Sequence, residues 1–185
     1  MDVNNLWIEL ENHINYLFTI IDNDEYSVEN YLKGYNLCYT LLKCDGLYKD
    51  KINKMEKIYF KSLSLYARKI VIPLLHKTHL ELAVDIDICY KKFNKISSRL
   101  RDIMMHLDQY KYDSKLSLKD SSKLIFREYV YKFVIEPNAL KSDIDNNIFN
   151  DENLSQQLLI MYNDMKNSYT LSSNNKINQK FIIEI

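Results

Sequence analysis

Glycine and proline are rare in this sequence, and their rarity limits the possible fold more than any other feature. Among 185 residues there are only two glycines, Gly34 and Gly46, and two prolines, Pro73 and Pro137. A sheet-rich fold needs many tight turns, and tight turns are built largely from these residue types. Long helices joined by a few loops need far fewer of them. The sequence therefore predicts an all-α fold.

The spacing of apolar residues agrees with this prediction. In the first twenty residues, Leu6, Leu10, Ile14 and Leu17 recur at intervals of three and four, which places them on one face of a helix. Similar patterns continue along most of the chain. They predict about six helices, over residues 3–22, 27–43, 47–71, 78–110, 118–136 and 154–169.

Four local signals mark helix ends. Ser27 is a suitable N-cap, and residues 78–81 (Thr-His-Leu-Glu) read as a capping box. Gly46 can adopt a left-handed conformation that ends a helix. Pro73 is expected to break or kink the chain.

The sequence predicts one domain. Residues 1–169 form the expected helical bundle, with a polar loop over residues 138–153. Residues 170–185 are expected to be a polar tail with a short apolar end. That end, residues 181–185, could be a strand, a docking tail or a cap.

Charge and hydropathy exclude several classes of partner. Twenty-five basic residues balance twenty-five acidic ones, whereas nucleic-acid binders usually carry a basic excess. No apolar run approaches the roughly 20 residues needed to span a bilayer. We therefore expect neither a nucleic-acid partner nor a membrane partner.

The chain's start and its cysteines predict a compartment. The first residues lack the basic and apolar regions of a secretory signal, and three cysteines form no disulfide framework. A reducing compartment, the cytoplasm or also the nucleus, is expected. Abundant Asn, Ile, Lys and Tyr fit an AT-rich genome such as that of a large DNA virus or a parasite, in which case the compartment is the host cell's.

No motif with a catalytic mechanism is present. Two glycines cannot form a phosphate-cradling loop, and the pair His76 and His79 lacks a third metal ligand. Cys38 and Cys89 are expected to be small core residues. The charged residues between 99 and 108 are expected to form a solvated helix face. The sequence therefore predicts no cofactor, no metal and no enzymatic activity.

Fifteen tyrosines are more informative. Tyr31 and Tyr35 stand four residues apart and share one helix face. They could be core residues. They could equally form a rigid aromatic patch for a partner, since tyrosine is enriched at binding hot spots. Composition leaves both interpretations open.

Three stretches together resemble a known family. They are Leu6-Trp7-Ile8-Glu9-Leu10, Tyr31-Leu-Lys-Gly-Tyr35-Asn36-Leu37-Cys38, and Arg101-Asp102-Ile103-Met104-Met105-His106-Leu107-Asp108 with Leu124-Ile125-Phe126-Arg127-Glu128 beyond it. In order and spacing they are similar to the first helical repeat of cullins, the elongated scaffolds of multi-subunit ubiquitin ligases. The resemblance covers about residues 3–136 and is weaker from about residue 138 onward.

The resemblance implies a partner and a contact surface. In cullins, the first repeat docks an adaptor of the BTB/POZ fold, which is either a BTB protein or the small adaptor that carries F-box receptors. By position, the implied contacts are Ser27, Val28, Asn30, Tyr31, Lys33, Gly34, Tyr35, Leu107, Asp108, Tyr110 and Tyr112. The 185 residues correspond to roughly one repeat, so no RING protein is expected to bind.

Two functions remain open from the sequence. The first is a non-catalytic module that binds a BTB/POZ adaptor and competes with or redirects host cullin-RING ligases. The second is a viral Bcl-type helical bundle that inhibits apoptosis or innate signalling by binding an amphipathic helix in a groove.

Overall fold

The fold is an all-α bundle, as the sequence predicts. The structure is a computed structural model that describes residues 2–22, 25–77, 79–109, 117–135, 140–146 and 151–174. Within these ranges every regular element is helical. The elements are α1 (Val3–Asp22), α2 (Val28–Lys43), α3 (Tyr48–Leu74), α4 (His79–Ile103), α5 (His106–Gln109), α6 (Leu118–Phe126), η1 (Arg127–Ile135), α7 (Leu140–Asp145) and α8 (Glu152–Asn174).

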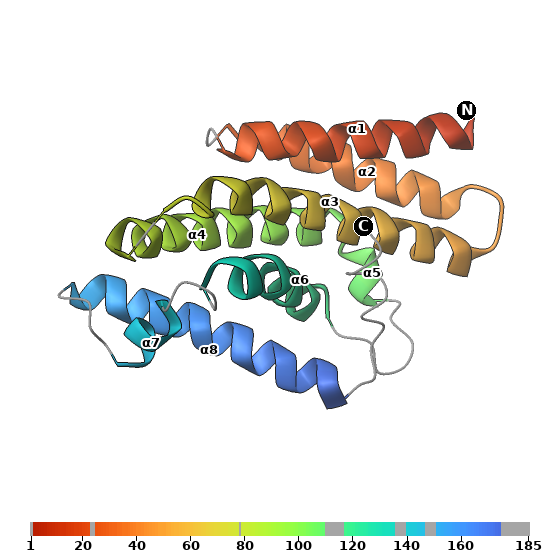
Figure 1. The fold of residues 1–185 in the computed structure, drawn as a ribbon. Helices are drawn as coiled ribbons and strands as arrows, with labels where there is room; N and C mark the ends of the chain where they lie inside the picture. The colour runs from red at the N-terminus through yellow and green to blue at the C-terminus, as the bar shows by residue number, and fades with distance from the viewer. Residues whose placement is uncertain are drawn as a thin grey trace.

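The helices form three layers (Figure 1). Helices α1 and α2 form one outer layer, α3 and α4 form the middle, and α6 with α8 forms the other outer layer. Large apolar side chains fill the space between layers, among them Leu10, Tyr59 and Phe93, each 0% exposed. The middle layer therefore separates the two outer layers, and each outer layer has its own solvent-exposed face.

The long helix predicted to continue to residue 110 is interrupted, so this prediction is wrong. Helix α4 ends at Ile103, Met104 and Met105 form a turn, and α5 begins at His106. The amide of Leu107 bonds to the carbonyl of Met104 at 2.8 Å, three residues back instead of four. The tighter turn redirects the chain, and it places α5 against the N-terminal half of the bundle.

Two helices extend further than their predicted boundaries. Helix α3 continues through Pro73 to Leu74, because a proline so near the end removes only one of the last hydrogen bonds. Helix α8 runs to Asn174, so the predicted start of the tail at residue 170 lies inside it. Residues 181–185 lie outside the described residues.

Two further corrections concern the C-terminal half. The predicted helix 118–136 forms, but from Arg127 to Ile135 it is a wider π-helix. The sequence predicts a loop over residues 138–153, yet α7 forms within them. Its Leu140 and Ile144 are buried four residues apart, and these two apolar contacts hold it against the bundle.

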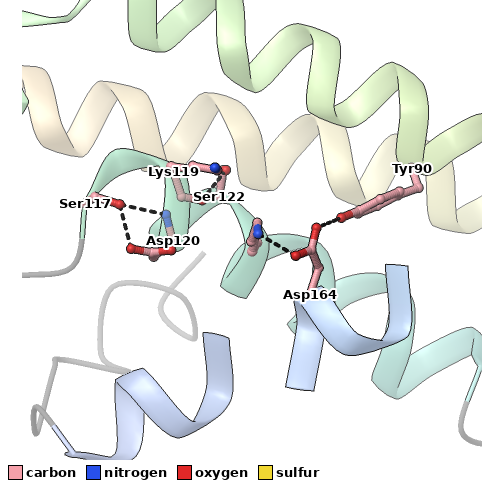
Figure 2. Close-up of polar contacts among 7 residues, drawn as sticks. Tyr90, Ser117, Lys119, Asp120, Ser122 and Asp164 are labelled. Atoms are coloured by element: carbon pink, nitrogen blue, oxygen red, sulfur yellow. Dashed lines mark hydrogen bonds and ion pairs between the residues drawn. The ribbon is translucent and has the colours of Figure 1, made fainter. Parts of the chain in front are cut away.

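A polar network joins α8 to the rest of the bundle (Figure 2). The Tyr90 hydroxyl donates to Asp164 Oδ2 and the Lys123 ammonium donates to Asp164 Oδ1, both at 2.7 Å. The three side chains come from α4, α6 and α8. Burial raises the pKa of the Asp164 carboxyl, but the hydrogen bonds from Lys123 and Tyr90 outweigh it and hold that pKa below its ordinary value.

Candidate protein-binding surface

Helix α2 begins where the sequence predicts and presents one face to the core. The Ser27 hydroxyl accepts a hydrogen bond from the Asn30 amide at 3.3 Å, which caps the helix. The buried face consists of Gly34, Leu37, Cys38 and Leu41. The opposite face of α2 is therefore turned to solvent.

Gly34 allows α2 to approach its neighbours closely. A Cβ atom at this position would lie 2.9 Å from Cγ2 of Ile103 on α4 and 3.0 Å from Cδ2 of His13 on α1. Both distances are shorter than ordinary van der Waals contact. Glycine is thus required here for packing, in spite of its poor helix propensity.

His13 joins α1 to the first turns of α2. Its Nε2 lies 2.8 Å from the carbonyl oxygen of Asn30, which can only accept, so Nε2 donates. The ring is 4% exposed. Burial lowers the pKa of His13, and the hydrogen bond to the Asn30 carbonyl opposes this shift without cancelling it.

The solvent-facing side of α2 is apolar over about three turns. Five side chains define it and are called the α2 stripe: Val28, Tyr31, Leu32, Tyr35 and Tyr39. Val28 is 74% exposed, Leu32 47% and Tyr39 41%, while the other two are half-buried. Single exposed apolar residues are common on protein surfaces, but a row of five on one helix face is a candidate binding surface.

The tyrosines of the α2 stripe pack against one another and against α5. Ring centroids are 5.9 Å apart between Tyr31 and Tyr35 and 6.3 Å apart between Tyr35 and Tyr39. The His106 ring lies 5.1 Å from that of Tyr35 and 6.1 Å from that of Tyr39. These contacts hold the rings in a fixed row before any partner arrives.

Charged groups lie at the margins of the α2 stripe. The Lys43 ammonium sits 4.3 Å above the Tyr39 ring, and Lys33 pairs with Glu9 of α1 at 3.8 Å. Such exposed pairs add little stability. An apolar centre with a charged rim is the usual composition of a protein-protein interface.

The predicted contact residues fall into three groups: those near the exposed side of α2, those in the core, and those at the end of the predicted long helix. Ser27, Val28, Tyr31, Lys33 and Tyr35 lie on or beside the exposed side of α2, and Asn30 is half-buried at its start. Two others are buried: Gly34 is enclosed by its neighbours and Leu107 is 1% exposed.

The remaining predicted residues concern the end of the long helix. Asp108 is exposed, and its Oδ1 accepts a hydrogen bond from the Leu118 amide at 2.9 Å, which links α5 to the first residue of α6. Tyr110 and Tyr112 lie outside the described residues. The two segments that the resemblance singles out nonetheless meet, since α5 contacts α2 through His106.

Sequence reasoning missed Leu32 and Tyr39 of the α2 stripe, and it missed Met105 and His106 after α4. Tyr39 continues the four-residue spacing of Tyr31 and Tyr35, so extending the pattern by one step would have found it. His106 and the exposed Met105 carry no comparable signal. They reach the surface only because the turn after Ile103 places them there.

Metal ligands and the Cys38 thiol can be assessed among the described residues. Among them, no group of three or more His, Cys, Asp or Glu side chains is placed to hold a metal ion. Cys38 is 0% exposed, and burial raises the pKa of its thiol to about 12, so it is a core residue. None of the described helices is long and apolar enough to cross a membrane.

No protein-family model matches this sequence, and no curated protein matches it either. The surface geometry and the motif resemblance therefore carry the functional argument.

Proposed function

We propose that this chain is a non-catalytic protein-interaction module that binds a BTB/POZ-fold adaptor of ubiquitin ligases. One observation carries the proposal. The row of tyrosine rings on α2 is partly open to solvent and lies against α5, which begins within the third resembling stretch, Arg101–Asp108.

The α2 stripe has the physical properties of a binding hot spot. Tyrosine buries a large ring at the expense of few rotatable bonds, and these rings are already held by their neighbours. A partner therefore orders little that is not ordered beforehand, which favours affinity. From Val28 to Tyr39 the stripe is about 17 Å long, enough for the centre of a standard interface of about 800 Å² per partner.

The choice of adaptor rests on the resemblance to cullins. Tyr31, Tyr35 and Asn36 stand at the positions of the cullin contact run, and α5 begins within the third resembling stretch, Arg101–Asp108. With Gly34 and Leu107 assigned to the core, the proposed contact set is revised. It consists of Val28, Tyr31, Leu32, Tyr35, Tyr39 and Met105.

Occupation of the adaptor has a defined consequence. A BTB/POZ adaptor presents one surface to its cullin, so a module bound there excludes the cullin. The proposed outcome is that the chain competes with host cullin-RING ligases or redirects their substrates. No catalytic group of this chain is required for that effect.

The proposal is tested by affinity capture from host-cell lysate with mass spectrometry. Wild type is compared with a Tyr31→Ala/Tyr35→Ala variant and with a control, Tyr16→Ala/Ile160→Ala, which removes two exposed side chains of α1 and α8 that are not part of the α2 stripe. We expect BTB-fold adaptors with wild type and with the control. The tyrosine variant should lose at least about 2 kcal/mol of binding, roughly thirtyfold in Kd.

Two results would overturn the proposal. One is adaptor capture that persists undiminished in a folded Tyr31→Ala/Tyr35→Ala variant. The other is recovery of apoptosis or innate-signalling proteins without any adaptor, which would support the Bcl-type interpretation instead.

A further inference from the structure

The exposed face of α3 carries a band of basic side chains. Lys57, Lys61, Arg68 and Lys69 are all exposed. None of the four forms an ion pair with any residue that the structure describes. They take no part in the core or in the α2 stripe.

Two branched apolar side chains interrupt this band. Leu65 is 47% exposed and Ile72 is 58% exposed. At 3.6 residues per turn, these two and the four basic residues fall within a sector of about 120°. We call the six the α3 basic face: Lys57, Lys61, Leu65, Arg68, Lys69 and Ile72.

No acidic residue of α3 lies between the basic residues of this face. The helix has two: Asp50, on the same side but about 10 Å before Lys57 along the helix axis, and Glu56, which is half-buried on the opposite side. Four positive charges thus occupy about 18 Å of helix with no intervening acid on α3. Neighbouring charges lie within or near a Debye length of about 8 Å, so their potentials reinforce one another. The balanced net charge of the chain conceals this local excess.

We propose that the α3 basic face binds the surface of an anionic phospholipid membrane. The basic residues attract the headgroups, and the exposed Leu65 and Ile72 insert among the upper acyl chains. This differs from a span, which the described helices do not provide. It also departs from the expectation of no membrane partner, because that expectation considered only spanning segments and net charge.

The composition of the face favours lipid over nucleic acid. It carries no aromatic side chain on which a base could stack, and lysine outnumbers arginine three to one. Exposed aliphatic side chains gain nothing against a phosphate backbone, but they gain apolar burial in a bilayer. The proposal is independent of adaptor binding, since α2 lies in a different layer (Figure 1).

The test is co-sedimentation of the full chain with vesicles at physiological ionic strength. Vesicles of phosphatidylcholine alone are compared with vesicles containing about 30% phosphatidylserine, within the anionic range that attracts basic segments. We expect binding only to the anionic vesicles. The Lys57→Ser/Lys61→Ser/Arg68→Ser variant should bind on the order of a hundredfold more weakly.

Matched variants separate this face from a general charge effect. Lys33→Ser/Lys43→Ser/Lys92→Ser removes the same charge from exposed positions on α2 and α4 and should change binding only a few-fold. Leu65→Asn/Ile72→Asn should weaken vesicle binding without removing its salt dependence. Tyr31→Ala/Tyr35→Ala should bind vesicles as wild type does.

Three results would overturn the proposal. The first is wild type that fails to sediment with anionic vesicles. The second is a control triple variant that loses as much binding as the α3 triple variant. The third is tighter binding of duplex DNA or RNA than of vesicles, with the α3 triple variant losing it, which would assign the face to nucleic acid.

Discussion

Tyrosines serve two different purposes on the two sides of the bundle. Where the middle layer meets α8, Tyr90 of α4 is 7% exposed and its hydroxyl donates to Asp164 at 2.7 Å (Figure 2). In the layer of α1 and α2, Tyr31, Tyr35 and Tyr39 contact one another through their rings. The hydroxyls of these three form no hydrogen bond with any described residue.

The difference shows how burial decides whether a tyrosine contributes to stability or is available for recognition. A buried hydroxyl without a partner would be unfavourable, so Tyr90 is tied into a network that fastens α8 to α4 and α6. The α2 tyrosines can leave their hydroxyls to water because their rings are only partly covered. Changes in the first group should therefore alter folding, and changes in the second should alter binding.

The largest expected effect comes from a substitution at Gly34, where α2 packs closely against its neighbours. This substitution should alter folding and binding together. Gly34→Leu would place a side chain against Ile103 and His13 and push α2 away from α4 and α1. We expect a loss of about 3 kcal/mol in the free energy of unfolding and a loss of adaptor binding as well. Chemical denaturation and the capture assay measure the two.

Asn36→Leu is the matched control, since Asn36 is exposed on the same helix. It should change the free energy of unfolding by less than about 0.5 kcal/mol. Equal stabilities for the two leucine variants would contradict the close packing assigned to Gly34.

A smaller effect tests the network at Asp164. Its folded-state pKa lies below the ordinary 3.8, so the unfolded chain takes up the proton first as pH falls. The stabilisation is present above that ordinary value and is lost as pH falls through the folded pKa. Asp164→Asn should remove about 1–2 kcal/mol at pH 7, toward the lower figure because the carboxylate is partly solvated.

Denaturation curves between about pH 7 and pH 3 check this prediction, since they cover the range in which a carboxyl titrates. The variant should lose less stability over that range than wild type does. Asp102→Asn, in an exposed pair with Arg99, serves as the control and should resemble wild type. An unchanged pH dependence in Asp164→Asn would contradict the stabilising role assigned to the Asp164 carboxylate.

The smallest expected effect comes from removing a single hydroxyl oxygen from one tyrosine of each group. Tyr90→Phe removes a buried hydrogen bond and should lower the free energy of unfolding by about 1 kcal/mol. Tyr35→Phe removes a hydroxyl without a described partner and should change it by less than about 0.5 kcal/mol. Thermal unfolding of both variants measures the difference, and equal shifts would contradict it.

The sequence predicts the helices well where each depends on its own apolar face. The bounds of α1 and α2 follow from the spacing of residues such as Leu6 and Leu10 and from the Ser27 cap. The interruption after Ile103 could not be predicted, because no glycine or proline marks it and Met104 and Leu107 continue the apolar pattern. Tertiary packing decides the break there.

Only part of the candidate surface can be predicted from the sequence, because tertiary packing places the rest. Tyr31 and Tyr35 follow from helical spacing, and Tyr39 from its continuation. The placement of His106 against them depends on the turn at Met104 and Met105 and on the close approach at Gly34. Both are contacts between segments far apart in the chain, which local pattern does not encode.

The most direct test is hydroxyl-radical footprinting of the chain with and without its captured adaptor, since oxidation reports side-chain exposure. The account predicts that Tyr31, Tyr35, Tyr39 and Met105 become protected in the complex, while the exposed Tyr16 and Ile160 remain as reactive as in the free chain. Protection of α1 or α8 with unchanged α2 tyrosines would contradict the claim that the α2 stripe is the partner-binding surface.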